Sequence, residues 1–178
     1  SGADADVTID GGTTALDIAA STIDGDLTLI SGNALGITDS GTVTVSGNLS
    51  VTTDTLNGVI NMGTLAVDGT IAANPNGTGS VTLVNDAGLN FEASTIGSGG
   101  LVATATTGNI TDSGALNITG TTTLVTSANN ATITLDTTTN AFIGALTITT
   151  NDNDGTDADV TIDGGTTALI IAASTIDG

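Results

Sequence analysis

Two stretches of this 178-residue chain are almost the same: residues 4–25 read DADVTIDGGTTALDIAASTIDG, and residues 157–178 read DADVTIDGGTTALIIAASTIDG. They are offset by 153 positions and differ at one place, where Asp17 is replaced by Ile170. A fixed period of this kind indicates a repeat architecture, in which each unit buries its apolar face only against stacked neighbours. We therefore predict that residues 1–178 form a single repetitive segment, a window of a longer chain.

A finer repeat divides this period. The tetrapeptide ASTI occurs at residues 20–23, 93–96 and 173–176, at offsets of 73 and 80, and ITDSG at residues 37–41 returns at 110–114. The period of 153 residues therefore consists of two half-units of about 73 and 80 residues.

The half-units differ in the length of one segment, which begins at Ser46 or Thr119 and ends at a glycine, Gly63 or Gly144, that we take as equivalent in the two half-units. Ser46 to Gly63 spans 17 positions, whereas Thr119 to Gly144 spans 25. We expect the shorter half-unit to lack about one strand with its turn, because the loops and edges of a repeat rod absorb such changes.

Alternation of apolar with polar or small residues predicts β-strands along the whole chain, since successive side chains of a strand point to opposite faces. Thr, Val and Ile favour strands, whereas Gly, Asn and Asp favour turns. No segment has the spacing of an amphipathic helix, so we expect essentially no helix. The side chains that we expect to point inward are Ile9, Leu29, Val45, Val51, Val67, Leu83, Phe91, Ile118, Leu135 and Ile148.

The long period selects a topology that alternation alone leaves open, because hairpin meanders also consist of short strands and turns. A three-sided parallel solenoid with about 20–25 residues per turn fits seven turns into one period. We therefore predict an all-β fold, a parallel β-helix (β-solenoid). At about 4.8 Å per turn, one period extends the rod by about 34 Å.

Composition excludes several classes of partner. The chain has no Lys, Arg, His or Cys, and its 18 Asp and one Glu give a net charge of −19. Nucleic-acid binding depends on cations that neutralise phosphate, so we expect no nucleic-acid partner. The longest purely apolar run, residues 168–173, is far shorter than the about 20 residues of a spanning helix, so we expect no membrane insertion. The charge and the absence of trypsin sites suit an extracellular polymer.

The acidic stretch at residues 151–163 holds five Asp in thirteen positions, and calcium prefers such oxygen ligands. The EF-hand pattern is absent, since with Gly155 as its glycine the first ligand position falls on Thr150 and no Glu closes the loop. A solvated acidic turn is the leading interpretation and calcium binding the alternative; no other cofactor is expected. The candidate metal ligands are Asp152, Asp154, Asp157 and Asp159.

Pairs of Thr separated by one residue suggest an outward Thr face. Flat Thr ladders on solenoids can bind ice, but Thr is also simply a favoured outward residue between buried apolar ones. The pairs are Thr42/Thr44, Thr104/Thr106, Thr121/Thr123, Thr132/Thr134 and Thr147/Thr149.

Other outward positions follow from the same alternation. Asp17 and, by its position in the repeat, Ile170 are expected to face solvent. An outward Ile170 indicates either drift at a tolerant position or a surface that another chain covers. The carboxylates expected at turns or on outward faces, without cationic partners, are Asp68, Asp86, Asp112 and Asp136.

Enzyme activity is not expected from these residue types. Ser and Cys nucleophiles need a neighbouring base, usually His, and the chain has no His, Cys or Lys. A glycosidase that uses a pair of Asp residues remains chemically possible. Near-identical copies at an offset of 153 favour a structural material over a catalytic site.

A succession of short motifs covers nearly the whole chain: ALDIAASTIDGDLTL, GITDSG, TVTVSGNLSV, NITDSGALNITGTTTL, ATITLD and AFIGALTIT. The order of these motifs resembles the repeats of filamentous-haemagglutinin-type adhesins. These are very large bacterial proteins exported by two-partner secretion. The resemblance implies a right-handed parallel β-helix, an extracellular or cell-surface rod, and a role in adhesion or matrix building.

Two functions of different classes follow. The leading hypothesis is a structural rod or filament-forming repeat region of a giant secreted bacterial surface protein, an adhesin shaft or extracellular filament that self-associates. The alternative is a glycan- or calcium-binding adhesion module on the same scaffold. A glycan site normally shows exposed aromatic rings, and the only aromatic residues, Phe91 and Phe142, occupy positions expected to be buried. The residues do not identify a receptor or glycan.

Overall fold

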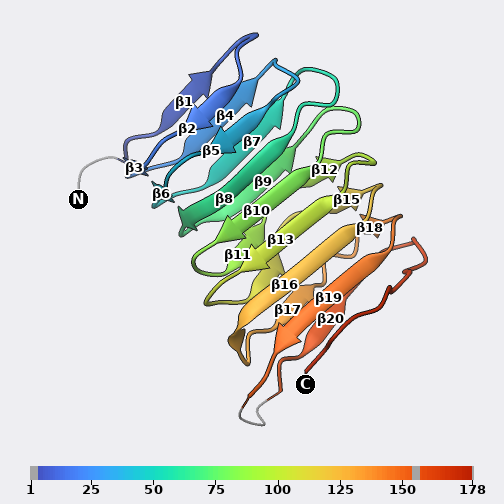
Figure 1. The fold of residues 1–178 in the computed structure, drawn as a ribbon. Helices are drawn as coiled ribbons and strands as arrows, with labels where there is room; N and C mark the ends of the chain where they lie inside the picture. The colour runs from blue at the N-terminus through green and yellow to red at the C-terminus, as the bar shows by residue number, and fades with distance from the viewer. Residues whose placement is uncertain (1–3, 154–156, 178) are drawn as a thin grey trace.

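The computed structural model describes residues 4–153 and 157–177 of the chain. This part consists of twenty short strands, β1 to β20, without a helix, and all strand pairs in it are parallel. Each strand pairs with a strand one coil before or after it along the chain, so the chain winds into a β-solenoid of about seven turns (Figure 1). The prediction of an all-β parallel solenoid is confirmed.

Two broad sheets form two sides of the solenoid. We call them sheet A and sheet B. Sheet A contains β1 (Val7–Asp10), β4 (Leu27–Ser31), β7 (Leu49–Thr53), β9 (Thr70–Asn74), β11 (Leu89–Phe91), β14 (Ile110–Asp112), β17 (Ile133–Leu135) and β20 (Val160–Ile162). Sheet B contains β2 (Leu16–Ile18), β5 (Ile37–Asp39), β8 (Ile60–Val67), β10 (Val81–Asn85), β13 (Leu101–Ala105), β16 (Thr122–Asn129) and β19 (Leu146–Asn151).

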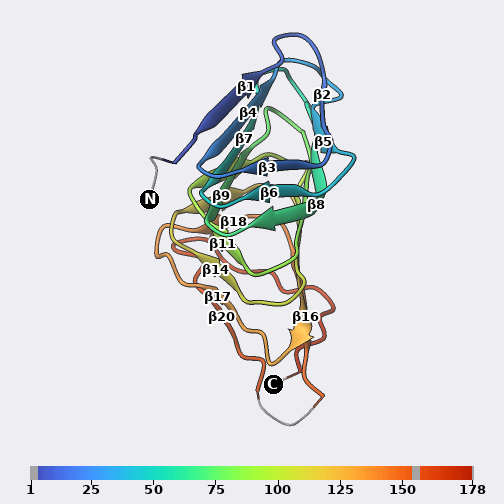
Figure 2. The same cartoon turned by 90° about the vertical axis from the view of Figure 1, so that its left-hand side faces the viewer.

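A narrow third side is made by two separate stacks of short strands. The first stack consists of β3 (Ser21–Ile23), β6 (Val43–Val45) and the last residues of β8, and it crosses between sheets A and B in Figure 2. The second stack consists of β12 (Ser94–Ile96), β15 (Leu116–Ile118) and β18 (Ala141–Phe142). The solenoid is therefore three-sided, with a third side that changes place along the rod.

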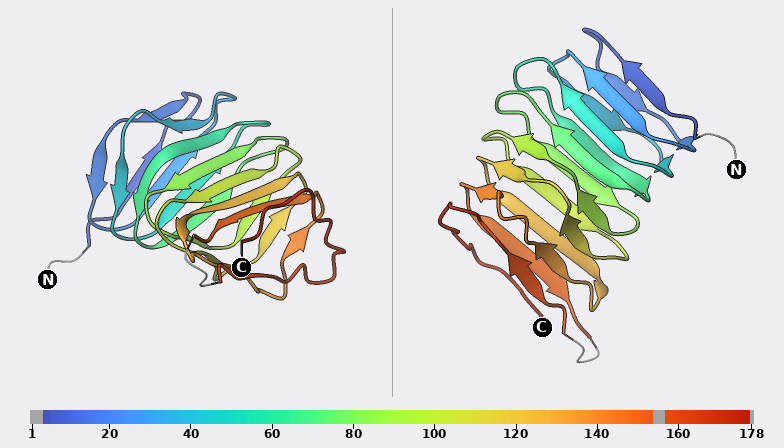
Figure 3. Two further views of the ribbon diagram at one scale, coloured as in Figure 1. Left: turned by 60° about the horizontal axis from the view of Figure 1, so that its bottom comes forward. Right: turned by 180° about the vertical axis from the view of Figure 1, so that it is seen from behind.

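The length of each coil can be read from the registers of sheet A. The first six steps from one strand to the next fall within the predicted range of coil length, and the last step, which contains the acidic stretch, is longer. Successive partners are Val7↔Leu27, Leu27↔Leu49, Leu49↔Ile71, Ile71↔Phe91, Leu89↔Ile110, Ile110↔Ile133 and Ile133↔Val160. The first and last strands lie at opposite ends of the stack, as the views in Figure 3 show.

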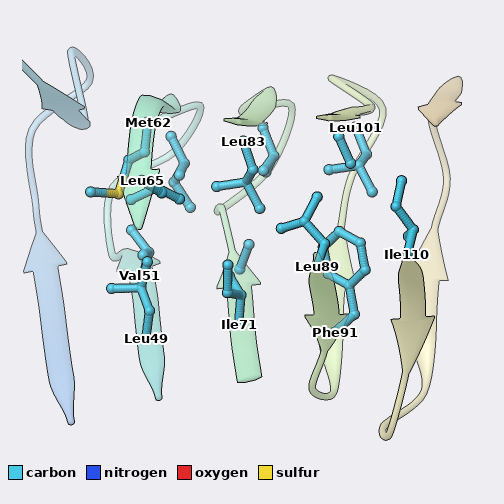
Figure 4. Close-up of a cluster of buried hydrophobic side chains, with 14 of the residues drawn as sticks. Leu49, Val51, Met62, Leu65, Ile71, Leu83, Leu89, Phe91, Leu101 and Ile110 are labelled. Carbon is cyan, nitrogen blue, oxygen red and sulfur yellow. The ribbon is translucent and has the colours of Figure 1, made fainter. Parts of the chain in front are cut away.

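One hydrophobic core runs between the two broad sheets. Figure 4 shows Leu49, Ile71 and Phe91 of sheet A facing Leu83 and other side chains of sheet B. Of the ten side chains predicted to point inward, nine are at most 2% exposed. The exception is Ile9, which is 36% exposed because it lies on the first coil and is covered from one side only. Each fully buried Leu or Ile stabilises the stack by about 1.5–3 kcal/mol.

Several hydrogen bonds recur at the offset of 73 positions, so the two half-units share local structure at these points. The only non-glycine residues with positive φ in the described part, Asn57 (67°) and Asn130 (61°), are separated by the same offset. In the first matching pair, Ser21 N donates to Thr42 O and Ser94 N donates to Ala115 O, both at 3.0 Å. In the second, Thr53 Oγ1 donates to Gly58 O and Thr126 Oγ1 donates to Ala131 O, both at 3.2 Å.

Equivalent strands of the two half-units lie in opposite sheets. β4 and β7 belong to sheet A, whereas their counterparts β13 and β16 belong to sheet B. Conversely, β2 and β5 belong to sheet B, and β11 and β14 belong to sheet A. Since seven coils make up the full period, a half-unit contains about three and a half coils and ends half a turn further round the rod.

The expectation that the shorter half-unit lacks a strand is wrong. The end of β8 pairs with β6, and β18 pairs with β15, so both half-units have a third-side strand at this point. The next residue bonds back in the same way in both, from Asp68 N to Val45 O and from Ile143 N to Ile118 O. Gly63 and Gly144 are therefore not equivalent, and the corners between strands take up the difference in length.

A buried asparagine ends the first third-side stack. Asn85 is fully buried, and its Oδ1 accepts the Val67 N–H at 2.8 Å while its Nδ2 donates to Val67 O at 3.0 Å and to Gly88 O at 2.6 Å. The side-chain amide thus replaces the peptide group that another strand would supply, and the backbone groups of Val67 keep their partners.

A serine begins the second stack. The Oγ of Ser94 accepts the Ala73 N–H at 3.0 Å and donates to Glu92 O at 2.9 Å. The equivalent Ser174 makes the same pair of bonds, accepting from Ile148 N and donating to Ala172 O, each at 3.0 Å. At both places the Oγ of the ASTI serine accepts a backbone N–H of the preceding coil, and in the second stack Ser94 is also the first residue of β12.

Candidate functional site

Three of the four predicted calcium ligands, Asp152, Asp157 and Asp159, lie between β19 and β20. Asp152 is half-buried and its N–H lies 3.4 Å from Asp177 Oδ2. Asp157 and Asp159 are exposed, and Asp154 lies outside the described residues. Within residues 4–153 and 157–177, no group of three acidic side chains is arranged to hold a metal ion. Calcium binding at this corner stays a prediction.

The acidic side chains have a structural role as hydrogen-bond acceptors along the rod. Asp6 Oδ1 accepts the Asp26 N–H at 3.0 Å, and Asp26 Oδ1 accepts the Asn48 N–H at 2.7 Å. Asn48 Oδ1 in turn accepts the Thr70 N–H at 2.9 Å. Each side chain thus binds the backbone one coil later, which joins coils at a corner where no strand pairing does so.

The four carboxylates predicted to lie at turns or on outward faces are found there. Asp68, Asp86 and Asp136 are exposed, and Asp112 is half-buried at the end of β14. Asp112 Oδ2 accepts from Asn140 Nδ2 at 2.6 Å, and its Oδ1 accepts the Asp136 N–H at 3.1 Å.

A regular surface of the described part is the outer face of sheet B over β10, β13, β16 and β19. The outward residues at the positions that all four strands share form two columns in register, and all eight are β-branched and uncharged. We call this surface the B plate. It consists of Thr82, Val102, Thr123 and Thr147 in one column and of Val84, Thr104, Val125 and Thr149 in the other. Val102 is 42% exposed and the other seven are half-buried.

The equivalent surface of the first half-unit lies on sheet A, over β1, β4, β7 and β9. We call it the A plate. It carries one charge, Asp10, at its end. It consists of Thr8, Thr28, Ser50 and Ala72 in one column and of Asp10, Ile30, Thr52 and Asn74 in the other.

The sequence pattern Thr-x-Thr located these plates only in part. Thr147 and Thr149 both lie within β19, whereas each of the other four pairs has one Thr outside a strand. Val has the same branched shape as Thr, so a search for β-branched residues in alternate positions would have found the B plate.

The residues at the single mismatch of the repeat both face solvent, as predicted. Asp17 is exposed on β2, and its Oδ1 lies 3.4 Å from Thr38 Oγ1 on the next coil. Ile170 is 56% exposed on the last described coil, where its carbonyl accepts the Leu146 N–H at 2.8 Å. Its neighbours Leu169 and Ile171 are exposed too, so exposure here is a property of the whole coil.

Two further features bear on partners. Phe91 and Phe142, the only aromatic residues of the chain, are buried, so no aromatic ring stacks on a ligand at the surface. Of the described residues, none belongs to a helix with the length and hydropathy needed to cross a membrane.

The fold and the repeated hydrogen bonds define a β-solenoid repeat protein. A family model described as Repeats of unknown function (DUF5649) matches residues 4–62 and 78–149, and the chain belongs to this family. The two matched segments begin just before the equivalent strands β1 and β10, so each match starts at the same point of a half-unit. No curated protein and no solved structure matches the chain.

Proposed function

We propose that this chain is a structural rod or filament-forming repeat region of a giant secreted bacterial surface protein, an adhesin shaft or an extracellular filament. The observation that carries the proposal is the position of the two near-identical copies. β1 and β20 lie in the same sheet, seven coils apart, so further copies would extend the rod along one axis with an unchanged cross-section.

The packing supports a mechanical role. Backbone hydrogen bonds between coils run along the rod axis, and the core is continuous from β4 to β19. Corner side chains such as Asp26 and Asn48 add bonds between coils outside the sheets. A pull along the axis is therefore resisted by many parallel bonds at every coil.

The bacterial and extracellular part of the proposal is supported by the resemblance to filamentous-haemagglutinin-type adhesins and by the absence of Lys and Arg. Antibodies raised against this chain should label the surface of intact cells of the source organism. Labelling only after the cells are made permeable would contradict the proposed location.

Small-angle scattering tests the rod itself. Chains that contain one, two and three copies of the full period should lengthen by about 34 Å per copy, while the cross-sectional radius of gyration stays constant. A cross-section that grows with the number of copies would contradict a rod.

A further inference from the structure

Charge restricts how two copies of this chain can touch. With a net charge of −19 and no Lys or Arg, any two acidic surfaces repel each other and no cation in the chain offsets the repulsion. The B plate is free of charge over all eight of its outward residues. A second copy that packs on the plate therefore meets no charge within it, and the exposed Asp86, which lines the same groove as Val84, borders it.

The shape of the B plate also fits a second copy. Rows repeat every about 4.8 Å along the rod, and the two columns are about 6.6 Å apart along each strand. A second B plate has the same spacings, so its rows can lie between those of the first. Close packing of alternating β-branched side chains between two sheets is the arrangement of dry interfaces between stacked β-sheets.

We infer that the B plate is a lateral contact surface on which a second copy of this chain packs face to face. This inference deepens the proposed rod function and rests on it, because pairing of rods side by side turns single shafts into a filament. Val102, the most exposed residue of the plate, lies in an inner row at the centre of the contact.

The area of the B plate sets the strength of the contact. Four rows and five residues along each strand give about 19 by 17 Å, or roughly 300 Å² per partner, against about 800 Å² per partner in a stable interface. One pair of plates thus associates weakly. A rod with several periods repeats the plate on the same side every seven coils, and avidity then strengthens the contact.

The half turn between half-units adds a second contact. The A plate is the equivalent surface on the opposite sheet, so a rod carries plates on both of its broad sides. Pairing through both plates places rods in a flat row rather than in isolated pairs. Asp10 makes the A plate the weaker of the two.

Disulfide trapping tests the contact on the full 178-residue chain, which has no natural Cys. Under mild oxidation, Val102→Cys should form covalent dimers at least tenfold faster than Asn117→Cys. Asn117 is the matched control, because it is exposed at the centre of β15 on the third side. Adding Thr123→Asp to Val102→Cys should slow dimer formation at least tenfold, and NaCl should speed it up by screening the like charges.

Equal rates for the two cysteines, or no effect of Thr123→Asp, would overturn the inference. The inference would also be overturned if the wild-type chain inhibited ice growth, the Val102→Asp variant did not, and no covalent dimers were trapped. The B plate would then be an ice-binding surface. Small-angle scattering distinguishes failure of the lateral contact from failure of the rod function. Tandem chains that lengthen normally but do not associate would support the rod function and contradict only the lateral contact.

Discussion

Strands β4 and β7 of the first half-unit and strands β13 and β16 of the second have the same alternation and equivalent hydrogen bonds, yet they lie in opposite sheets. The alternation and these hydrogen bonds are shared because they depend on local sequence. The sheet in which a strand lies depends instead on the number of coils that precede it. A half-unit of three and a half coils therefore gives one motif two opposite orientations on the rod.

The same comparison explains the third side. In the first half-unit the short strands follow sheet B, and in the second they follow sheet A. Two polar residues make this change possible: Asn85 ends one stack, and Ser94 begins the other. The repeat thus needs specific buried hydrogen bonds at the point where its two halves meet.

The largest expected effect comes from a buried charge at equivalent core positions. Val45→Asp and Ile118→Asp should each destabilise the fold by more than about 4 kcal/mol, because the chain contains no cation to pair with a buried carboxylate. Urea unfolding followed by circular dichroism measures the loss. The outward controls Thr44→Asp and Asn117→Asp should change stability by at most about 0.5 kcal/mol. If one core variant were as stable as the wild type, the half-units would not be equivalent.

A smaller loss is expected where the third side changes place. Asn85→Ala leaves the buried N–H and C=O of Val67 without partners, and should cost about 2–4 kcal/mol. Ser94→Ala removes the acceptor of one N–H and should cost about 1–2 kcal/mol. Urea midpoints of the two variants measure the difference. If Ser94→Ala lowered the urea midpoint more than Asn85→Ala did, the first stack would not depend on Asn85.

The smallest effect concerns charge on the outer surface. Raising NaCl should increase the thermal midpoint, because salt screens repulsion among the exposed carboxylates. Because the acidic stretch at residues 151–163 is expected to be solvated rather than metal-bound, CaCl2 at the same ionic strength should add nothing beyond this, and EDTA should have no effect. A further rise with CaCl2 that Asp157→Asn abolishes would instead establish the calcium site.

The alternation of the sequence predicts which side chains point inward, since each strand has only two faces. Leu83 and Phe91 are buried and Asp17 is exposed for this reason. The sequence does not predict the sheet in which a strand lies, because that depends on the summed lengths of all preceding corners. The error over Gly63 and Gly144 has the same cause: two glycines were aligned without knowing which strands they follow.

The candidate surface was predictable only in part, for a chemical reason. Thr-x-Thr pairs indicated an outward face, but Val102 reads as a core residue in the sequence and is exposed in the structure. Leu101 and Ala103 on either side of it are buried, and because side chains alternate along a strand, Val102 points outward. Likewise, Asn85 resembles a turn residue, and its role appears only when Val67 from the preceding coil lies beside it.

The distance between spin labels at Ser50 and Thr123 tests the half-turn relation most directly. These residues occupy equivalent positions of the two half-units and lie on the outer faces of β7 in sheet A and β16 in sheet B. The control pair, Ser50 and Thr134, lies on one sheet, although its members are further apart along the rod. Each residue is changed to Cys, labelled, and measured by double electron–electron resonance. We predict a longer distance for Ser50–Thr123 than for Ser50–Thr134, because the core and both sheets separate the first pair. A shorter distance for Ser50–Thr123 would place both half-units on the same side and contradict the account.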